Sequence, residues 1–203
     1  MLVSLLSPVA LMGAFASTVL AHGNIVWFKS DGITNPGLLW NYWIQAVPAP
    51  LTAKVKAGET VTFHYETSTG GGWSHEEGPI FTYVVNCHGS CTAVDYTQLE
   101  WVKINAAGYD TASKKWASQS FRANNSTWTT TVPASLAPGT ANQPNGAQAY
   151  PKGLNIEITG SGTKTPSGTL GTKLYKADDP GFAFNPYKPF TNYPMPGPAL
   201  FTD

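Results

Sequence analysis

The chain is 203 residues long; 42% of its residues are hydrophobic and only 12% are charged. Its 12 basic side chains balance its 12 acidic ones, so the composition excludes both a basic surface for nucleic acid and a net field that attracts a charged substrate. Length and composition fit one globular domain with a neutral partner. Some of the 7 Trp, 9 Tyr and 9 Phe are expected on the surface, where rings stack on sugar faces, although most belong in the core.

The first 21 residues are almost wholly apolar or small and carry no charged side chain. They end in Val-Leu-Ala, which places small residues at the third and first positions before a cut. This pattern is typical of a signal peptide and predicts a secreted, extracellular protein. The alternative is a membrane anchor, but Pro8 and Gly13 interrupt the run and no second apolar run of spanning length follows. We therefore expect a signal peptide at 1–21, a single domain over 22–203 and no membrane partner.

Segments with period-two alternation or β-branched residues recur after the leader, separated by Gly, Pro, Asn and Ser. No segment shows an amphipathic helical stripe. Several strands at this spacing predict an all-β fold, an antiparallel sandwich, rather than a parallel sheet with crossover helices. The six predicted strands span 24–28, 60–66, 80–86, 99–104, 126–132 and 154–159.

After Thr163 the chain becomes rich in Pro, Gly and Asn and loses the alternation of a strand. A disordered linker is one interpretation, but apolar anchors recur through this stretch, so we expect a tail that wraps the sandwich. The anchors are Leu174, Tyr175, Phe182, Phe184, Tyr187 and Phe190.

The two cysteines, Cys87 and Cys91, lie four residues apart. In an oxidising compartment this spacing favours a local disulfide that closes a tight loop. The rival interpretation is a metal site formed with His88, but a structural zinc usually has four ligands and the chain has no second cluster. We expect His88 to face solvent.

Residues 124–127, Asn-Asn-Ser-Thr, contain two overlapping glycosylation sequons, so Asn124 and Asn125 are both candidate acceptors. Such a site fits a surface loop of a secreted protein.

Cleavage after Ala21 would leave His22 as the first residue. A free terminal amine has a pKa of about 7.7 to 8.0, so a divalent metal displaces its proton near neutrality, and the adjacent ring nitrogen closes a chelate. A third nitrogen from another imidazole would complete a T-shaped site, and copper binds such ligands most tightly among the first-row divalent ions.

His75 is the candidate for that third ligand, because it lies in a Gly-rich loop just before the predicted strand at 80–86. An ordinary loop histidine is the alternative. His64 is interpreted as a half-exposed residue in the middle of a strand.

Several motifs appear in an order that resembles one family, the fungal lytic polysaccharide monooxygenases of auxiliary activity family 9, formerly glycoside hydrolase family 61. The resemblance spans nearly all of the chain after the leader. The motifs are His22-Gly23, the loop from Ser74-His75 to Gly78-Pro79, the loop Cys87 to Cys91, the run Gly146 to Pro151, the tail Leu174 to Gly181 and the closing Pro194 to Pro198.

The resemblance implies an immunoglobulin-like or fibronectin-like antiparallel sandwich, with long loops, that holds one copper per chain. The implied metal ligands are His22, through its amine and ring, and His75, with Tyr150 near the axial position. Gln148 matches the second-sphere glutamine of the family and, with Tyr150, would serve catalysis.

The resemblance further implies oxidation of C1 and/or C4 of cellulose or another β-1,4-glucan, with O₂ or H₂O₂ and an external electron donor, by a monomer. Tyr193 matches a tyrosine on the substrate-facing plane of the family. Packing in the core is the alternative for Tyr193.

The chain departs from the family pattern in three places. Gly139-Thr140 passes directly into a segment without strand pattern, so the strand that carries a second-sphere histidine in the family has no counterpart. The segment 30–50 is shorter than in the family, and Gly153 replaces a family cysteine. The loop after His75 has one residue more before Gly78 than the commonest form.

These departures motivate a second hypothesis, a catalytically impaired relative that binds copper or carbohydrate. A glycoside hydrolase is less favoured, because the clustered carboxylates, Glu76-Glu77 and Asp178-Asp179, are adjacent in sequence, whereas glycoside cleavage needs two opposed carboxylates.

Overall fold

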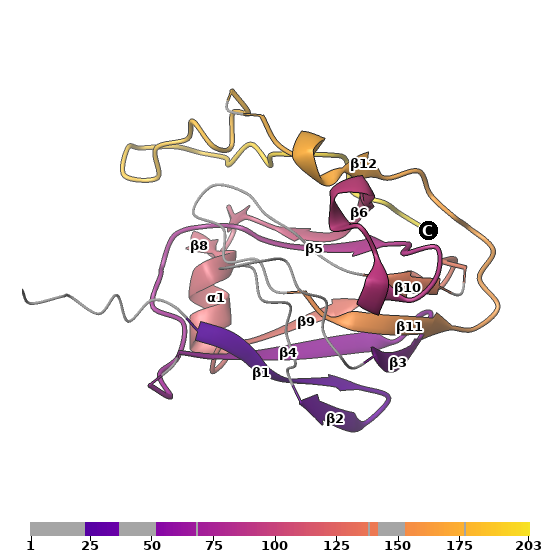
Figure 1. Ribbon diagram of the computed structural model, residues 1–203. Helices are drawn as coiled ribbons and strands as arrows, with labels where there is room; N and C mark the ends of the chain where they lie inside the picture. The colour runs from indigo at the N-terminus through magenta and orange to yellow at the C-terminus, as the bar shows by residue number, and fades with distance from the viewer. Residues whose placement is uncertain (1–22, 37–51, 68, 138, 142–152, 177) are drawn as a thin grey trace, which may run out of the picture.

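The computed structural model describes residues 23–36, 52–67, 69–137, 139–141, 153–176 and 178–203. These residues form a β-sandwich with one four-stranded antiparallel sheet below a second layer (Figure 1). The lower sheet has the order β2-β1-β4-β9. Its strands are β1 (Gly23–Ser30), β2 (Ile33–Pro36), β4 (Thr60–Thr67) and β9 (Thr127–Thr131).

The second layer contains two three-stranded sheets, β12-β6-β5 and β10-β11-β3. In the second of these, β11 and β3 run parallel, whereas the other pairings are antiparallel. The strands are β3 (Thr52–Lys56), β5 (Ile80–Val85), β6 (Glu100–Ala107), β10 (Gly139–Ala141), β11 (Asn155–Thr159) and β12 (Thr169–Leu170).

The described residues contain one α-helix, and a short hairpin precedes it. The hairpin is β7 (Tyr109–Asp110) and β8 (Lys115–Trp116), and the helix is α1 (Ala117–Ala123). Single 3₁₀ turns occupy Cys91–Ala93, Tyr96–Gln98 and Gly171–Lys173. Within the described part of the chain, no helix combines the length and apolar character that a membrane crossing requires.

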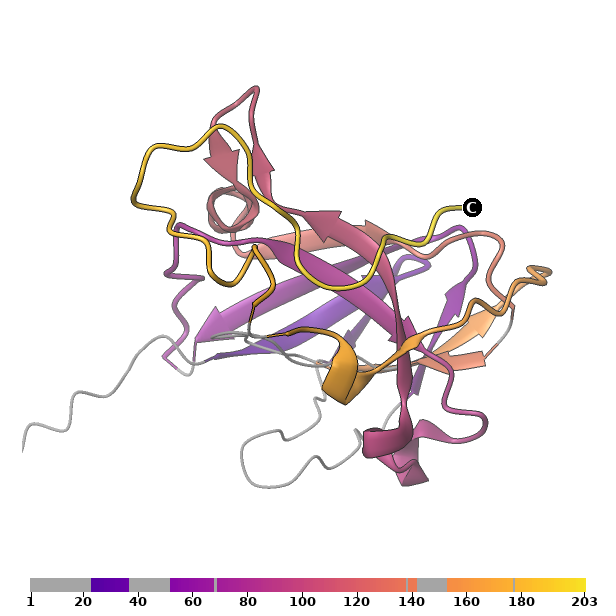
Figure 2. The ribbon, with the colours of Figure 1, turned by 90° about the horizontal axis from the view of Figure 1, so that it is seen from above.

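Strands β5 and β6 have buried side chains on both faces of their sheet. Val84 and Ile104 point inward and join the core between the layers. Tyr83, Val85 and Trp101 point outward into a second cluster, where the tail covers them. Figure 2 shows the tail, in orange and yellow, crossing over this outer face. The prediction of a wrapped tail is therefore confirmed.

The all-β class and the six predicted strands are confirmed; five match within two residues at either end, and the strand predicted at 99–104 ends three residues later, at Ala107. Three elements differ from expectation. The chain contains helix α1, which is too short to show a helical stripe. The pair β11 and β3 is parallel. Gly139–Ala141 forms a strand on β11, so the prediction that the chain passes directly into irregular structure at Gly139-Thr140 is wrong for these three residues.

The sandwich has two ends with different contents. The α1 end is where β1, β5 and β9 begin and where helix α1 packs. The pocket end is where β5 ends and β6 begins, and it contains the disulfide loop.

Candidate metal centre

Strand β1 begins in close contact with the end of β4. Gly23 pairs with Thr67, and a Cβ atom at Gly23 would lie 2.0 Å from the carbonyl oxygen of Glu66. A glycine is therefore required at the position that follows His22 in the chain. His22 itself lies outside the described residues, as do Gln148 and Tyr150.

The loop that carries His75 departs from the end of β4. A tight turn starts it: the Thr67 amide donates to the Gly71 carbonyl at 2.7 Å, and the Gly71 amide donates to Thr67 Oγ1 at 2.7 Å. Gly70, at φ 79°, takes the left-handed conformation that this turn needs. The loop therefore begins beside the first residue of β1.

Helix α1 contacts the same loop at three points. The buried Ser118 accepts a hydrogen bond from Trp73 Nε1 at 3.2 Å, and its amide donates to the Gly78 carbonyl at 3.2 Å. One turn further along, Arg122 Nη1 donates to Glu76 Oε1 at 2.6 Å. These three loop residues lie on both sides of His75, so the helix fixes the path of the loop around it.

The His75 ring is half-buried and packs edge-on against the Trp73 indole, with ring centroids 5.1 Å apart. Trp73 in turn contacts Tyr65 and Phe121, at centroid distances of 5.2 and 5.7 Å. Its amide also donates to Ser126 Oγ at 2.7 Å. The ring of His75 thus rests on a fixed aromatic surface.

The other described histidines are placed away from this role. His64 is only 7% exposed, so the prediction of a half-exposed strand residue is wrong; its ring nitrogens lie 3.1 Å from Thr127 Oγ1 and 3.1 Å from Glu66 Oε1. His88 is exposed, as predicted, in the loop at the pocket end. No three His, Cys, Asp or Glu side chains form a metal-binding group within the described ranges.

Cys87 and Cys91 form a disulfide with an S–S distance of 2.03 Å, which confirms the predicted bond. Both sulfurs are therefore paired, and the rival metal site with His88 is wrong. The bond closes the loop in which the His88 amide donates to Asn86 Oδ1 at 2.8 Å.

Tyr193 is 6% exposed and packs against Trp116 and Phe184, with ring centroids 4.9 and 5.1 Å away. Its hydroxyl donates to the Gly181 carbonyl at 3.2 Å, and burial raises the pKa of Tyr193 to about 12. This burial agrees with the core-packing alternative. The exposed tyrosine of the tail is Tyr187, at 81%, which sequence reasoning did not distinguish from the tail's anchors.

The buried side chain of Lys103 binds the tail to the outer face of β5 and β6. Lys103 Nζ donates to the Pro196 carbonyl at 2.7 Å, and its ammonium lies 4.7 Å from the centroid of the Phe81 ring. The hydroxyls of Tyr83 and Tyr175 lie 2.6 Å apart. Burial lowers the pKa of Lys103 and raises the pKa of both tyrosines.

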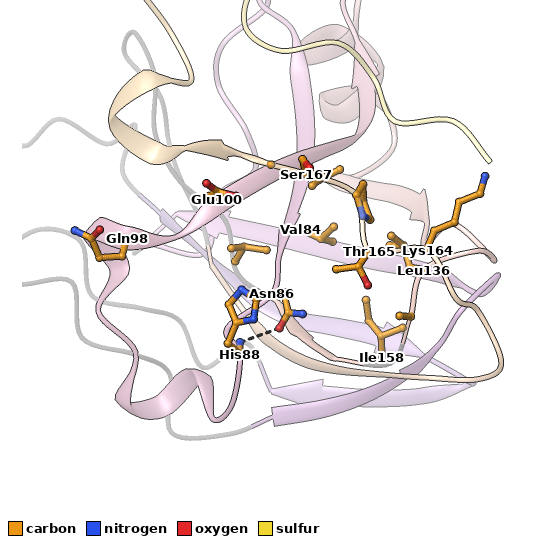
Figure 3. A pocket seen from close by; sticks show the side chains of 15 residues that line it. Val84, Asn86, His88, Gln98, Glu100, Leu136, Ile158, Lys164, Thr165 and Ser167 are labelled. Carbon is orange, nitrogen blue, oxygen red and sulfur yellow. Dashed lines mark hydrogen bonds between the residues drawn. The ribbon is translucent and has the colours of Figure 1, made fainter.

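A pocket of about 320 Å³ opens at the pocket end (Figure 3). Val84, Leu136 and Ile158 give it aliphatic walls, and His88 and Glu100 contribute polar groups. The described residues that line it include no Phe, Tyr or Trp, so they offer no flat aromatic ring to a sugar. The pocket and the His75 loop lie at opposite ends of the sandwich.

Sequence reasoning missed Trp73, Ser118, Arg122 and Ser126 as supports of the His75 loop. Trp73 could have been flagged by its position two residues before His75. The others lie far away in the chain, and their hydrogen bonds leave no local pattern.

Comparisons with known proteins agree with this geometry. The sequence profile of Auxiliary Activity family 9 (formerly GH61) matches residues 21–193. AA9 family lytic polysaccharide monooxygenase D of Botryotinia fuckeliana (strain B05.10) is 39% identical over 251 residues, which covers 99% of this chain and 99% of that relative. AA9 family lytic polysaccharide monooxygenase A of Malbranchea cinnamomea is 45% identical over 76% of this chain, which spans 50% of that relative.

A solved structure shows the same fold. The glycoside hydrolase family 61 member Cel61B from Hypocrea jecorina matches with a TM-score of 0.81 and 35% identity, covering 89% of this chain and 100% of that chain. The Botryotinia alignment runs over 251 positions whereas this chain has 203 residues, so that relative contains segments without a counterpart here. Such gaps agree with the internal deletions expected from the motifs. The chain belongs to Auxiliary Activity family 9, formerly GH61.

Proposed function

We propose that this chain is a secreted, copper-dependent lytic monooxygenase that begins at His22 after cleavage and oxidises C1 and/or C4 of cellulose or a related β-1,4-glucan. Its family supports oxidative cleavage of polysaccharides. The observation that carries the proposal is the backbone arrangement at the α1 end. β1 begins one residue after His22, and it begins beside the end of β4 from which the His75 loop departs.

The donor set suits copper. His22 would bind through its amine and ring, His75 through its ring and Tyr150 through its hydroxyl oxygen, and Gln148 would act as a second-sphere residue. Nitrogen-rich sets of this kind favour Cu(II) among the first-row divalent ions. Bound copper would supply one-electron chemistry, using an external electron donor and O₂ or H₂O₂.

The described residues have defined tasks in this proposal. Gly23 allows β1 to approach β4 without a clash, so the start of β1, directly after His22, is held beside the end of β4. Trp73 supports one side of the His75 ring. A half-buried imidazole on a fixed loop needs little reorganisation to bind a metal, which favours affinity.

Tyr187 is the side chain that we propose contacts the glucan. It is highly exposed, and the tail that carries it packs through Phe184 and Phe190 against Trp116, next to α1. In Figure 1 the yellow tail loop and helix α1 lie toward the same end of the sandwich. An exposed ring on a fixed loop stacks on a sugar face at low cost in conformational entropy.

The proposal is tested by expressing the chain with its leader and measuring the N-terminal residue, copper stoichiometry and oxidised products. We expect His22 first, one copper per chain, and aldonic or C4-oxidised oligosaccharides from cellulose when a reductant is present. His75→Ala should lose stoichiometric copper, and His88→Ala, at the pocket end, should retain it. A blocked or extended N-terminus, or copper binding without oxidised products where a reference enzyme is active, contradicts the proposal.

A separate variant tests the substrate surface. Tyr187→Ala should weaken binding to cellulose by about three- to tenfold, the range expected for losing one stacked ring. The thermal unfolding midpoint should not change, because the side chain is exposed. The matched control is Ile33→Ala, an exposed apolar residue on β2. Equal losses in both variants would argue against a specific contact.

A second function is favoured by one observation. The described residues of β10, Gly139–Ala141, include no histidine, and the resemblance places the family's second-sphere histidine on the strand that follows this turn. Without that histidine, the chain would be a copper- or carbohydrate-binding relative with impaired catalysis. Copper loading and cellulose binding without oxidised products would support this second function over the first.

A further inference from the structure

We infer that Ser118 is a positioning residue for His75, acting through Trp73 and Gly78 without touching the metal site itself. This inference rests on the proposed copper function of His75. It assigns to helix α1 the task of holding the ligand loop in its binding conformation.

The first support is that Ser118 contacts both sides of the loop. Its side-chain oxygen accepts from Trp73 Nε1, two residues before His75, and its amide donates to the carbonyl of Gly78, three residues after His75. One buried residue therefore fixes the separation between the two ends of the ligand segment.

The second support is the position of the Trp73 ring. The indole that donates to Ser118 is the same ring that packs edge-on against His75. Its backbone amide is held separately by Ser126 Oγ. With the backbone fixed, the bond to Ser118 determines the orientation of the indole, and the indole limits the orientations open to the imidazole.

The third support is the ion pair of Arg122 with Glu76, the residue that directly follows His75. Both side chains are about half exposed, so this pair stabilises the protein only weakly. It nevertheless holds the loop to the same helix at a third point. The resemblance implies one extra residue in this loop, and the contacts to α1 would hold a loop of that length in place.

The test compares Ser118→Ala with Ser120→Ala, which makes the same chemical change two residues along the same helix at an exposed position. In the mature protein, Ser118→Ala should raise the dissociation constant for Cu(II) by about two- to tenfold, the range expected for the loss of one neutral hydrogen bond. The Cu(II) electron paramagnetic resonance spectrum should change as well. Ser120→Ala should match the wild type, and Ser118→Thr, which keeps the hydroxyl, should restore most of the affinity.

Trp73→Phe provides a second route that does not alter the helix. It removes the indole donor and keeps an aromatic ring beside His75. If both residues act through one hydrogen bond, the double variant with Ser118→Ala should bind copper no more weakly than the weaker single variant. Additive losses would contradict a shared path.

Hydrogen exchange without metal separates this inference from the proposed function. Peptides covering 73–78 should exchange faster in Ser118→Ala than in Ser120→Ala. If the wild type binds no copper but this difference appears, the proposed function fails and the positioning of the loop stands. If the wild type binds copper while Ser118→Ala and Ser120→Ala agree in affinity, spectrum and exchange, the inference is overturned.

Discussion

The two ends of the sandwich are stabilised by different contacts. At the α1 end, hydrogen bonds and aromatic rings join a helix, a loop and a strand that are far apart in sequence. At the pocket end, aliphatic side chains line a cavity and one short disulfide loop closes the edge. The difference indicates that the contacts that support the proposed ligand loop are separate from the aliphatic core at the pocket end. Stability and metal affinity should therefore respond to different substitutions.

The largest expected effect comes from the pocket end. Ile158 is buried in the core and lines the pocket, so Ile158→Ala should lower the free energy of unfolding by about 2–5 kcal/mol. Denaturant unfolding measures this loss. Ile33→Ala, at an exposed position, should change it by less than about 0.5 kcal/mol. The folded fraction of Ile158→Ala should bind Cu(II) with the affinity of the wild type. Weaker copper binding by this variant would contradict the conclusion that the two ends act independently.

The disulfide gives a smaller effect at the same end. Replacing Cys87 and Cys91 together by Ala should cost about 2 kcal/mol, as the chain-entropy relation predicts for so short a loop. Copper affinity should stay unchanged because the loop lies opposite His75. An unfolding midpoint equal to that of the wild type would show that the bond does not stabilise this end.

Alkaline pH should act mainly through the tyrosines under and within the tail. Burial raises the pKa of Tyr193 to about 12, so this hydroxyl stays protonated in the folded protein while it ionises near pH 10 in the unfolded chain. Between these values the unfolded state has lost a proton that the folded state keeps. The free energy of unfolding should therefore fall by up to about 1.4 kcal/mol per pH unit for this residue.

Two variants separate the contributions to that pH dependence. Tyr193→Phe should reduce the slope above pH 10 by about one proton, measured by denaturant unfolding at stepped pH. The raised pKa values of Tyr83 and Tyr175 act in the same direction. Lys103 acts oppositely below about pH 10.5, because its lowered pKa leaves the unfolded state with more protons, and Lys103→Met should remove that rise. Slopes identical to the wild type in both variants would contradict these assignments.

The smallest effect on stability is expected from a glycan at the α1 end. Asn125 is exposed at φ 49°, while Asn124 uses its side-chain amide to donate to the Thr127 carbonyl at 2.9 Å, so we predict glycosylation at Asn125. Asn125→Gly fits the same backbone conformation and should remove the glycan mass while changing stability by less than about 0.5 kcal/mol. Asn124→Gln should keep the glycan. Mass spectrometry showing the opposite pattern would place the glycan on Asn124.

The strands and the disulfide could be predicted from the sequence because their signals are local. The β-branched and apolar residues of 60–66 and 80–86 identify these segments as strands from their own neighbourhood, and a spacing of four brings two cysteines within reach of a disulfide. Helix α1 escaped prediction because seven residues make only two turns, and its buried residues include Ser118. A hydrogen bond between Trp73 and Ser118 joins residues 45 positions apart, and nothing in either neighbourhood reveals it.

The tail shows the same limit in another form. Tyr187 and Tyr193 lie in one Pro-rich stretch without periodicity. The sequence predicts Tyr187 to be a buried anchor and the resemblance implies that Tyr193 faces the substrate, because composition cannot rank their burial. Their different exposure follows from three-dimensional packing against Trp116 and Phe184. The metal ligands implied by the resemblance, His22, His75 and Tyr150, and the second-sphere role of Gln148 stay predictions.

The fastening of the tail by Lys103 has a consequence for synthesis. The strands β5 and β6 emerge from the ribosome well before Pro196, the residue whose carbonyl accepts from Lys103. Until then Tyr83 and Trp101 have no cover, and the nascent chain carries an aromatic surface open to other chains. Folding of this protein is therefore completed from its C-terminal segment, and a chain that stops before Leu174 would expose a surface prone to aggregation.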